Sequence, residues 1–234
     1  MRVIVSVQSQ SNSTRGLVHY IAHSKIDPTR EQIGSRNLFD DRSDLINVEQ
    51  ANFSLKPGVS TNRPKNEDLM HLVISFRPED FHKLGVDEKE RRQSLREITR
   101  ESMRNLEKTV GAESLDWAAA IHRNTDNPHV HIAISKHFLS LEKGKHEMLK
   151  RIPTSALPHY ELVDQKKVLV PGVLMETAAK KMDEIIARNP TRELVRYDHD
   201  LAAEKMPEMT LARQPIVQEA RKPKQHIHES IHIR

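Results

Sequence analysis

Three histidines flank one turn in the segment HRNTDNPHVHIAIS, residues 122–135. His122 precedes the turn, and His129 and His131 follow it, two positions apart. The ring nitrogens of neutral imidazoles are common ligands of divalent metal ions. Three converging rings would hold one ion and leave further coordination positions for water or a substrate. The alternative is three ordinary packed or solvated histidines, because 14 of the 234 residues are His.

The alternation of side chains on either side of the turn favours the metal site. Residues 115–122 and 129–135 are predicted to be the two strands of a hairpin, in which successive side chains point to opposite faces. One face is apolar, and the other carries the three histidines together with Ala118, Ala120 and Ala133. If the strands pair, His122 lies opposite or diagonal to His129, with Cβ atoms about 4.5–7 Å apart. We therefore predict a metal site in a space that the alanines leave open, with an affinity that rises with pH because protons compete for the same nitrogens.

Further segments complete a predicted sheet and its helices. Strands are predicted over 2–8 and 70–77. Between 27 and 66 we expect either short strands, near 36–39 and 51–55, or a loop that orders on a ligand. Helices are predicted over 15–25, 87–110 and 173–187. On strand 70–77, one face consists of His71, Val73, Ser75 and Arg77, and Ser75 is expected to join the side of the three histidines.

The predicted helix over 87–110 carries a basic ridge on its flank, made of Arg92, Arg96, Arg100 and Arg104. Glu97 and Glu101 lie beside this ridge. The mixture of signs favours a solvated helix face over a phosphate-binding one.

The composition limits the class of protein. The chain has 37 basic and 33 acidic side chains, a net charge of +4 and a pI near 9.2, so any contact with nucleic acid must come from local clustering. The absence of Cys excludes disulfides and thiolate metal sites, and no apolar run approaches a membrane span. We expect one folded domain over 1–190 and a partly ordered extension over 191–234, and whether the chain is a fragment of a longer protein stays open. The tail histidines His226, His228 and His232 are attributed to composition.

Three segments resemble, in order, the motifs of the conjugative relaxases of the HUH endonuclease superfamily. RGLVHYIAHSK resembles the first motif, HLVISFRP the second, and HRNTDNPHVHIAIS the third. Together they span about residues 1–137, and the class that they resemble most is the P-type mobilisation relaxases. The resemblance implies an α/β (α+β) fold, the HUH relaxase palm. Its central, mainly antiparallel sheet would have about five strands, with helices on one face and the metal on the other.

The resemblance also assigns roles to residues. It makes Tyr20 the nucleophile and implies a divalent ion, most simply Mg²⁺ or Mn²⁺, on the three histidines. Ser75 would contact the DNA at the cleavage site, and Arg77 is a phosphate partner by its charge.

Three further residues are candidates for supporting roles. Asn124 stands where many relatives carry Asp, and an uncharged amide is a poorer partner for orienting a metal-bound imidazole. Asp126, two positions on, is an alternative source of that charge. His23, one helical turn after the nucleophile, is a candidate proton acceptor.

The implied activity is site- and strand-specific nicking and rejoining of DNA at the origin of transfer of a plasmid or integrative element. A tyrosine attack on the scissile phosphate conserves the bond energy in a 5′-phosphotyrosyl intermediate. The implied partners are single-stranded and hairpin DNA, accessory relaxosome proteins and a type IV coupling protein. The protein would act in the bacterial cytoplasm without membrane insertion and be exported with the DNA.

Three other functions stay open at this point. A rolling-circle initiator or single-strand transposase belongs to the same superfamily, but its nucleophile typically follows the histidine motif, whereas Tyr20 precedes it. An unrelated hydrolase with a three-histidine metal site would leave Tyr20 idle. A non-catalytic DNA-binding module would have kept the fold but lost the activity.

Overall fold

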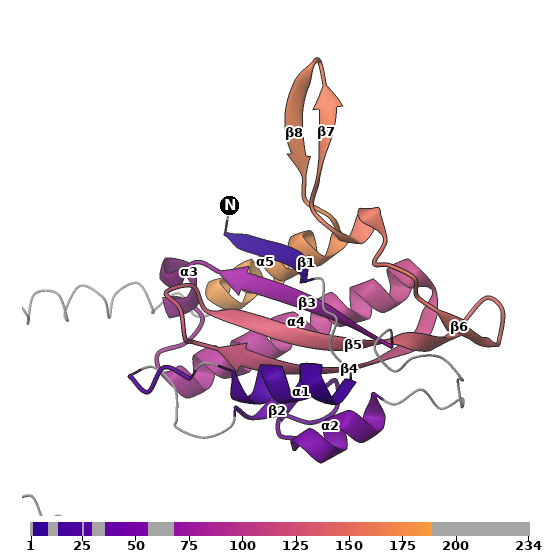
Figure 1. The fold of residues 1–234 in the computed structure, drawn as a ribbon. Coiled ribbons are helices and arrows are strands. Elements are labelled where there is room, and N and C mark those ends of the chain that lie inside the picture. Colours follow the sequence, from indigo (N-terminus) through magenta and orange to yellow (C-terminus); the bar gives the residue numbers. More distant parts are fainter. Residues whose placement is uncertain (1, 9–13, 25, 30–35, 56–67, 189–234) are drawn as a thin grey trace, which may run out of the picture. The chain divides into compact units, whose positions relative to one another are not determined.

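A six-stranded antiparallel sheet organises the computed structural model (Figure 1). The structure describes residues 2–8, 14–24, 26–29, 36–55 and 68–188, so the predicted extension over 191–234 lies outside it. Across the sheet the strands follow the order β1 (Val3–Gln8), β3 (Leu69–Phe76), β5 (His129–Ser140), β4 (Ala112–His122) and β2 (Leu38–Phe39), and β6 (His146–Met148) pairs with β5. A separate two-stranded ribbon consists of β7 (His159–Val163) and β8 (Lys166–Val170).

Five α-helices accompany the sheet in the described part of the chain. They are α1 (Thr14–His23), α2 (Val48–Ser54), α3 (Pro78–His82), α4 (Glu88–Val110) and α5 (Val173–Ala187), and a short 3₁₀ helix spans Thr154–Ala156. None of the helices in these ranges combines the length and the apolar character that a bilayer crossing requires.

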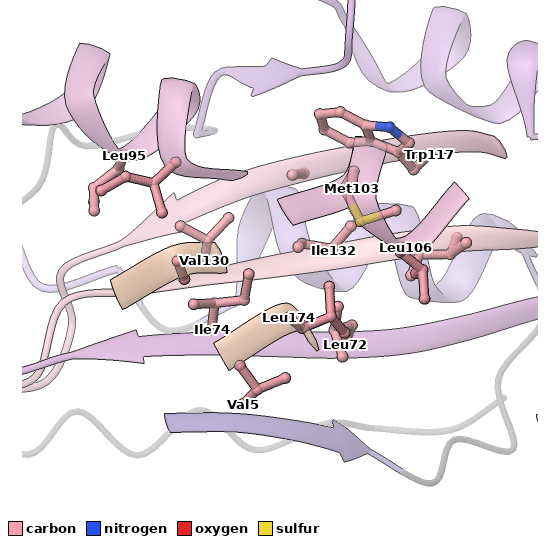
Figure 2. Close-up of a cluster of buried hydrophobic side chains, with 14 of the residues drawn as sticks. Val5, Leu72, Ile74, Leu95, Met103, Leu106, Trp117, Val130, Ile132 and Leu174 are labelled. Carbon is pink, nitrogen blue, oxygen red and sulfur yellow. The ribbon is translucent and has the colours of Figure 1, made fainter. Parts of the chain in front are cut away.

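The main core lies between one face of the sheet and helices α4 and α5 (Figure 2). It includes Ile74, Trp117 and Ile132 from the sheet, and all three side chains are buried. Helix α4, which packs against them, has well-defined ends. Asp87 caps its first turn, and Gly111 ends it with a left-handed φ of 68°.

The opposite face is covered only in part. Leu17, Val18 and Ile21 of α1 pack in a second apolar cluster, which also contains Ala118, Ala120 and Ala133 of the sheet and side chains from α2. The prediction that these alanines leave an open space is wrong, because they are fully buried beneath α1. Their small side chains instead allow the helix to approach the sheet closely.

The fold class is confirmed, with differences at particular elements. Helices α4 and α5 lie on one face as predicted, and the predicted strands near 2–8, 36–39, 70–77, 115–122 and 129–135 are present. The prediction of a strand over 51–55 is wrong, because residues 51–54 belong to helix α2. Asn47 and Gln50 form a reciprocal capping box that starts α2 there.

Replacing Ala120 by Leu tests the close contact between α1 and the sheet. Because Ala120 is fully buried against α1, the larger side chain should lower the free energy of unfolding by about 1–3 kcal/mol in urea denaturation. Ala187→Leu, an exposed position at the end of α5, is the matched control and should change stability little. Equal stability of the two variants would contradict this packing.

Candidate active site

The register of the sheet brings the three predicted ligands together. His122 of β4 lies directly opposite His129 of β5, and His131 is the next residue of β5 on the same face. The ring centroids are 4.2 Å apart for His122 and His131, 4.9 Å for His129 and His131, and 5.3 Å for His122 and His129. One ring nitrogen from each residue lies within 4.8 Å of the others, so one ion placed among them would be in reach of all three.

Each of the three rings is held by a hydrogen bond through one nitrogen. The Nε2 of His122 donates to the carbonyl of Ile21 at 2.7 Å, and the Nδ1 of His129 donates to the carbonyl of Asn127 at 2.9 Å. The Nδ1 of His131 lies 2.6 Å from the Nε2 of His71. The nitrogens that these bonds do not use are the candidate ligand atoms: Nδ1 of His122, Nε2 of His129 and Nε2 of His131.

Burial favours the neutral, metal-binding form of His131. It lowers the pKa of His131 to about 2, with further contributions from the neighbouring imidazoles of His122, His129 and His71 and from Arg36. It also lowers the pKa of His71 to about 4. A metal-binding imidazole must be deprotonated at the ligating nitrogen, so a neutral His131 beside two further oriented rings fits a divalent ion.

Tyr20 lies beside the same cluster. Its ring meets those of His71 and His131 edge-on, with centroids 6.0 Å and 5.8 Å apart, and 41% of the residue is exposed. The next residue, Ile21, is fully buried and its carbonyl accepts the bond from His122. The hydroxyl-bearing residue is therefore accessible while its helix is joined directly to a predicted metal ligand.

A cavity of about 590 Å³ extends from the histidines along the uncovered half of this face. Its lining includes Ser75 and Arg77 of the predicted DNA contacts together with His129 and His131. It also contains Arg2, which precedes β1, and residues from β1 and the 123–128 turn, namely Ile4, Ser6, Gln8, Thr125 and Asn127. The arrangement joins the histidine cluster to a groove whose lining carries two arginines, Arg2 and Arg77, among polar and apolar side chains.

The remaining predicted site residues lie at the margin. His23 is exposed and contacts His19, with ring centroids 4.4 Å apart. Asp126 is exposed in the turn, and the buried Oδ1 of Asn124 has no hydrogen-bond partner among the described residues. The hydrogen-bond partners observed at the three rings are the carbonyls of Ile21 and Asn127 and the ring of His71.

Sequence reasoning missed these three partners. Two are backbone carbonyls, which carry no residue-type signal. His71 had a signal, because alternation placed it on the same face as Ser75. What was lacking was the register, which sets His71 opposite Ala133 and hence diagonal to His131.

The basic ridge of α4 takes no part in the site. Arg100 and Arg104 form ion pairs with Asp44 and Asp41 in the segment before α2. The predicted solvated face is therefore found only in part: Arg104 is exposed, whereas Arg92, Arg96 and Arg100 are partly buried.

An antiparallel sheet with histidines on one face and a tyrosine-bearing helix beside them is the architecture of the HUH relaxase palm. The sequence matches the family model of the MobL relaxases over residues 7–214, and the chain belongs to this family. Membership makes it a DNA-nicking relaxase of mobilisation that binds DNA at an origin of transfer. No curated protein matches the sequence, and no solved structure matches it.

His122→Ala and His129→Ala should differ in stability in the presence of EDTA. Removing the buried ring of His122 leaves the Ile21 carbonyl without this donor and opens a cavity, so it should cost about 2–4 kcal/mol of unfolding free energy. His129 is half-buried and its bond stays within its own turn, so its loss should cost less than about 1 kcal/mol. Urea denaturation measures both, and an equal or reversed order would show that the bond to Ile21 does not anchor α1.

Proposed function

We propose that Tyr20 is the nucleophile that cuts one DNA strand at the origin of transfer. The observation that carries this proposal is the hydrogen bond between His122 and the carbonyl of Ile21. It fixes the helix of Tyr20 to the histidine cluster, which would bring the hydroxyl close to a phosphate bound at the cluster. Holding reactants in position lowers the barrier without any additional chemical group.

His122, His129 and His131 would hold the divalent ion. Of Mg²⁺ and Mn²⁺, the all-nitrogen donor set favours Mn²⁺, since Mg²⁺ prefers oxygen ligands. When bound, the ion would polarise a non-bridging oxygen of the scissile phosphate and offset the charge that develops on it.

The covalent step uses the hydroxyl of Tyr20 as the attacking group. The Oη of Tyr20 passes its proton to a base, for which His23 is the candidate, and forms a bond to the phosphorus. The bond from phosphorus to the 3′ oxygen breaks, and the departing 3′ oxygen takes up a proton from water. The product is a 5′-phosphotyrosyl strand with a free 3′-hydroxyl, and the reverse reaction rejoins the strand. No separate energy source is required, because one phosphodiester replaces another.

The groove beside the histidines would hold the single strand that flanks the scissile phosphate. Arg77 is exposed and Ser75 partly exposed along this groove, and both suit phosphate oxygens. On β1, the side chains of Ile4, Ser6 and Gln8 share the same face and offer apolar and polar surface to the bases.

Other finer features are carried over from the relaxase family. They include recognition of hairpin DNA at the origin, accessory relaxosome proteins, a type IV coupling protein, action in the bacterial cytoplasm and export with the DNA. The relaxase domain would occupy residues 1–190 and the extension 191–234. Asn124 and Asp126 would be polar supports of the metal site, and His23 a proton acceptor.

Tyr20→Phe should abolish formation of a covalent protein–DNA adduct. The assay mixes the full chain, Mn²⁺ and labelled single-stranded oligonucleotides that tile the element carrying the gene, followed by denaturing electrophoresis. Tyr160→Phe is the matched control, because it deletes the same hydroxyl from the β7–β8 ribbon, where Tyr160 is 70% exposed. Cleaved ends without any adduct in the unmodified protein would instead indicate a metal-dependent hydrolase.

Arg77→Ala should weaken binding of a mixed-sequence 20-nucleotide single strand and reduce the slope of log K against log salt by about 0.7. Fluorescence anisotropy over a range of KCl concentrations, in EDTA to prevent cleavage, measures both quantities. Arg104→Ala is the control, since Arg104 is half-exposed and pairs with Asp41 and Glu101 on another surface. The groove assignment is wrong if the two variants lose affinity equally.

A further inference from the structure

A fourth histidine, His71 of β3, contacts the cluster and the ring of Tyr20. It is 2% exposed, its ring stacks on that of His131 with centroids 4.8 Å apart, and its Nε2 lies 2.6 Å from the Nδ1 of His131. The residue directly opposite it on β5 is Ala133. Because a methyl group leaves space there, the ring of His71 can lean diagonally over to His131.

The bond between the two imidazoles has a direction that metal binding decides. One nitrogen must donate and the other accept. If His131 binds an ion through Nε2, that nitrogen carries no proton, so the proton of the neutral ring is on Nδ1 and is donated to His71. The opposite direction would put the proton of His131 on Nε2 and block ligation. His71 must therefore accept at Nε2 and carry its own proton on Nδ1.

We propose that His71 is a positioning residue that holds His131 in the ligating tautomer and orientation. The inference rests on the proposed metal site. Metal-bound imidazoles usually donate to a carboxylate, a backbone carbonyl or water. Here the acceptor is a neutral ring, which orients His131 without adding negative charge. The acceptor therefore does not offset the positive charge of the ion, which remains available to attract the phosphate.

His71→Leu and His71→Gln separate orientation from bulk. Leu fills similar space without an acceptor, whereas the side-chain oxygen of Gln can replace Nε2. Titration with Mn²⁺ alone, followed by the electron paramagnetic resonance signal of the free ion, should show affinity about 10- to 100-fold weaker for Leu and nearly unchanged for Gln. His137→Leu is the control, because it removes a largely buried histidine that contacts Asp68, at the other end of β5.

A second measurement needs no variant and keeps the inference testable if His71→Leu fails to fold. Nitrogen-15 NMR of the histidine rings in the Zn²⁺-loaded full chain reports which nitrogen carries each proton. The proposal requires protons on Nδ1 of His131 and on Nδ1 of His71. A proton on Nε2 of His71, a direct bond from His71 to the ion, or unchanged Mn²⁺ affinity in His71→Leu would overturn it. If the unmodified protein binds no Mn²⁺, the proposed metal site itself fails, and the inference fails with it.

Discussion

The hydrogen bond from His122 to the carbonyl of Ile21 is the contact on which the site depends. It joins two residues 101 positions apart in the sequence, one on β4 and one on α1. The apolar packing of Leu17 and Ile21 holds α1 against the sheet, but apolar contacts are not directional and do not fix the helix along its axis. A hydrogen bond does, and because Tyr20 precedes Ile21, the bond that orients one predicted ligand also places the predicted nucleophile.

One face of the sheet forms the apolar core, and the other carries the residues of the proposed site. One face packs against α4 and α5 through large apolar side chains such as Trp117 and Ile132. The other is built from cross-strand rows in which His131, Val73 and Ser6 are neighbours, as are His129, Ser75 and Ile4. Helix α1 covers this second face only where the alanines allow it. The uncovered part is the groove that ends at the histidine cluster.

Much of this arrangement is predictable from the sequence, because it follows from local periodicity. Alternation places His122, His129, His131 and Ser75 on one face, and helical spacing places Leu17 and Ile21 on the buried side of α1. The roles of the alanines and of His71 depend on long-range pairing, which periodicity does not contain. The β7–β8 ribbon was missed because its turn residues, Asp164 and Gln165, adopt positive φ without the glycine that normally signals such a turn.

Mass spectrometry of the trapped protein–DNA adduct tests the central claim most directly. Trypsin would place the three tyrosines in different peptides, with Tyr20 in residues 16–25, Tyr160 in 152–166 and Tyr197 in 197–205. After nuclease digestion of the bound strand, we expect the nucleotide mass on Tyr20 within peptide 16–25. A nucleotide on Tyr160 or Tyr197 would contradict the account. In the part of the chain that the structure describes, Tyr20 is the tyrosine whose helix is hydrogen-bonded to the histidine cluster.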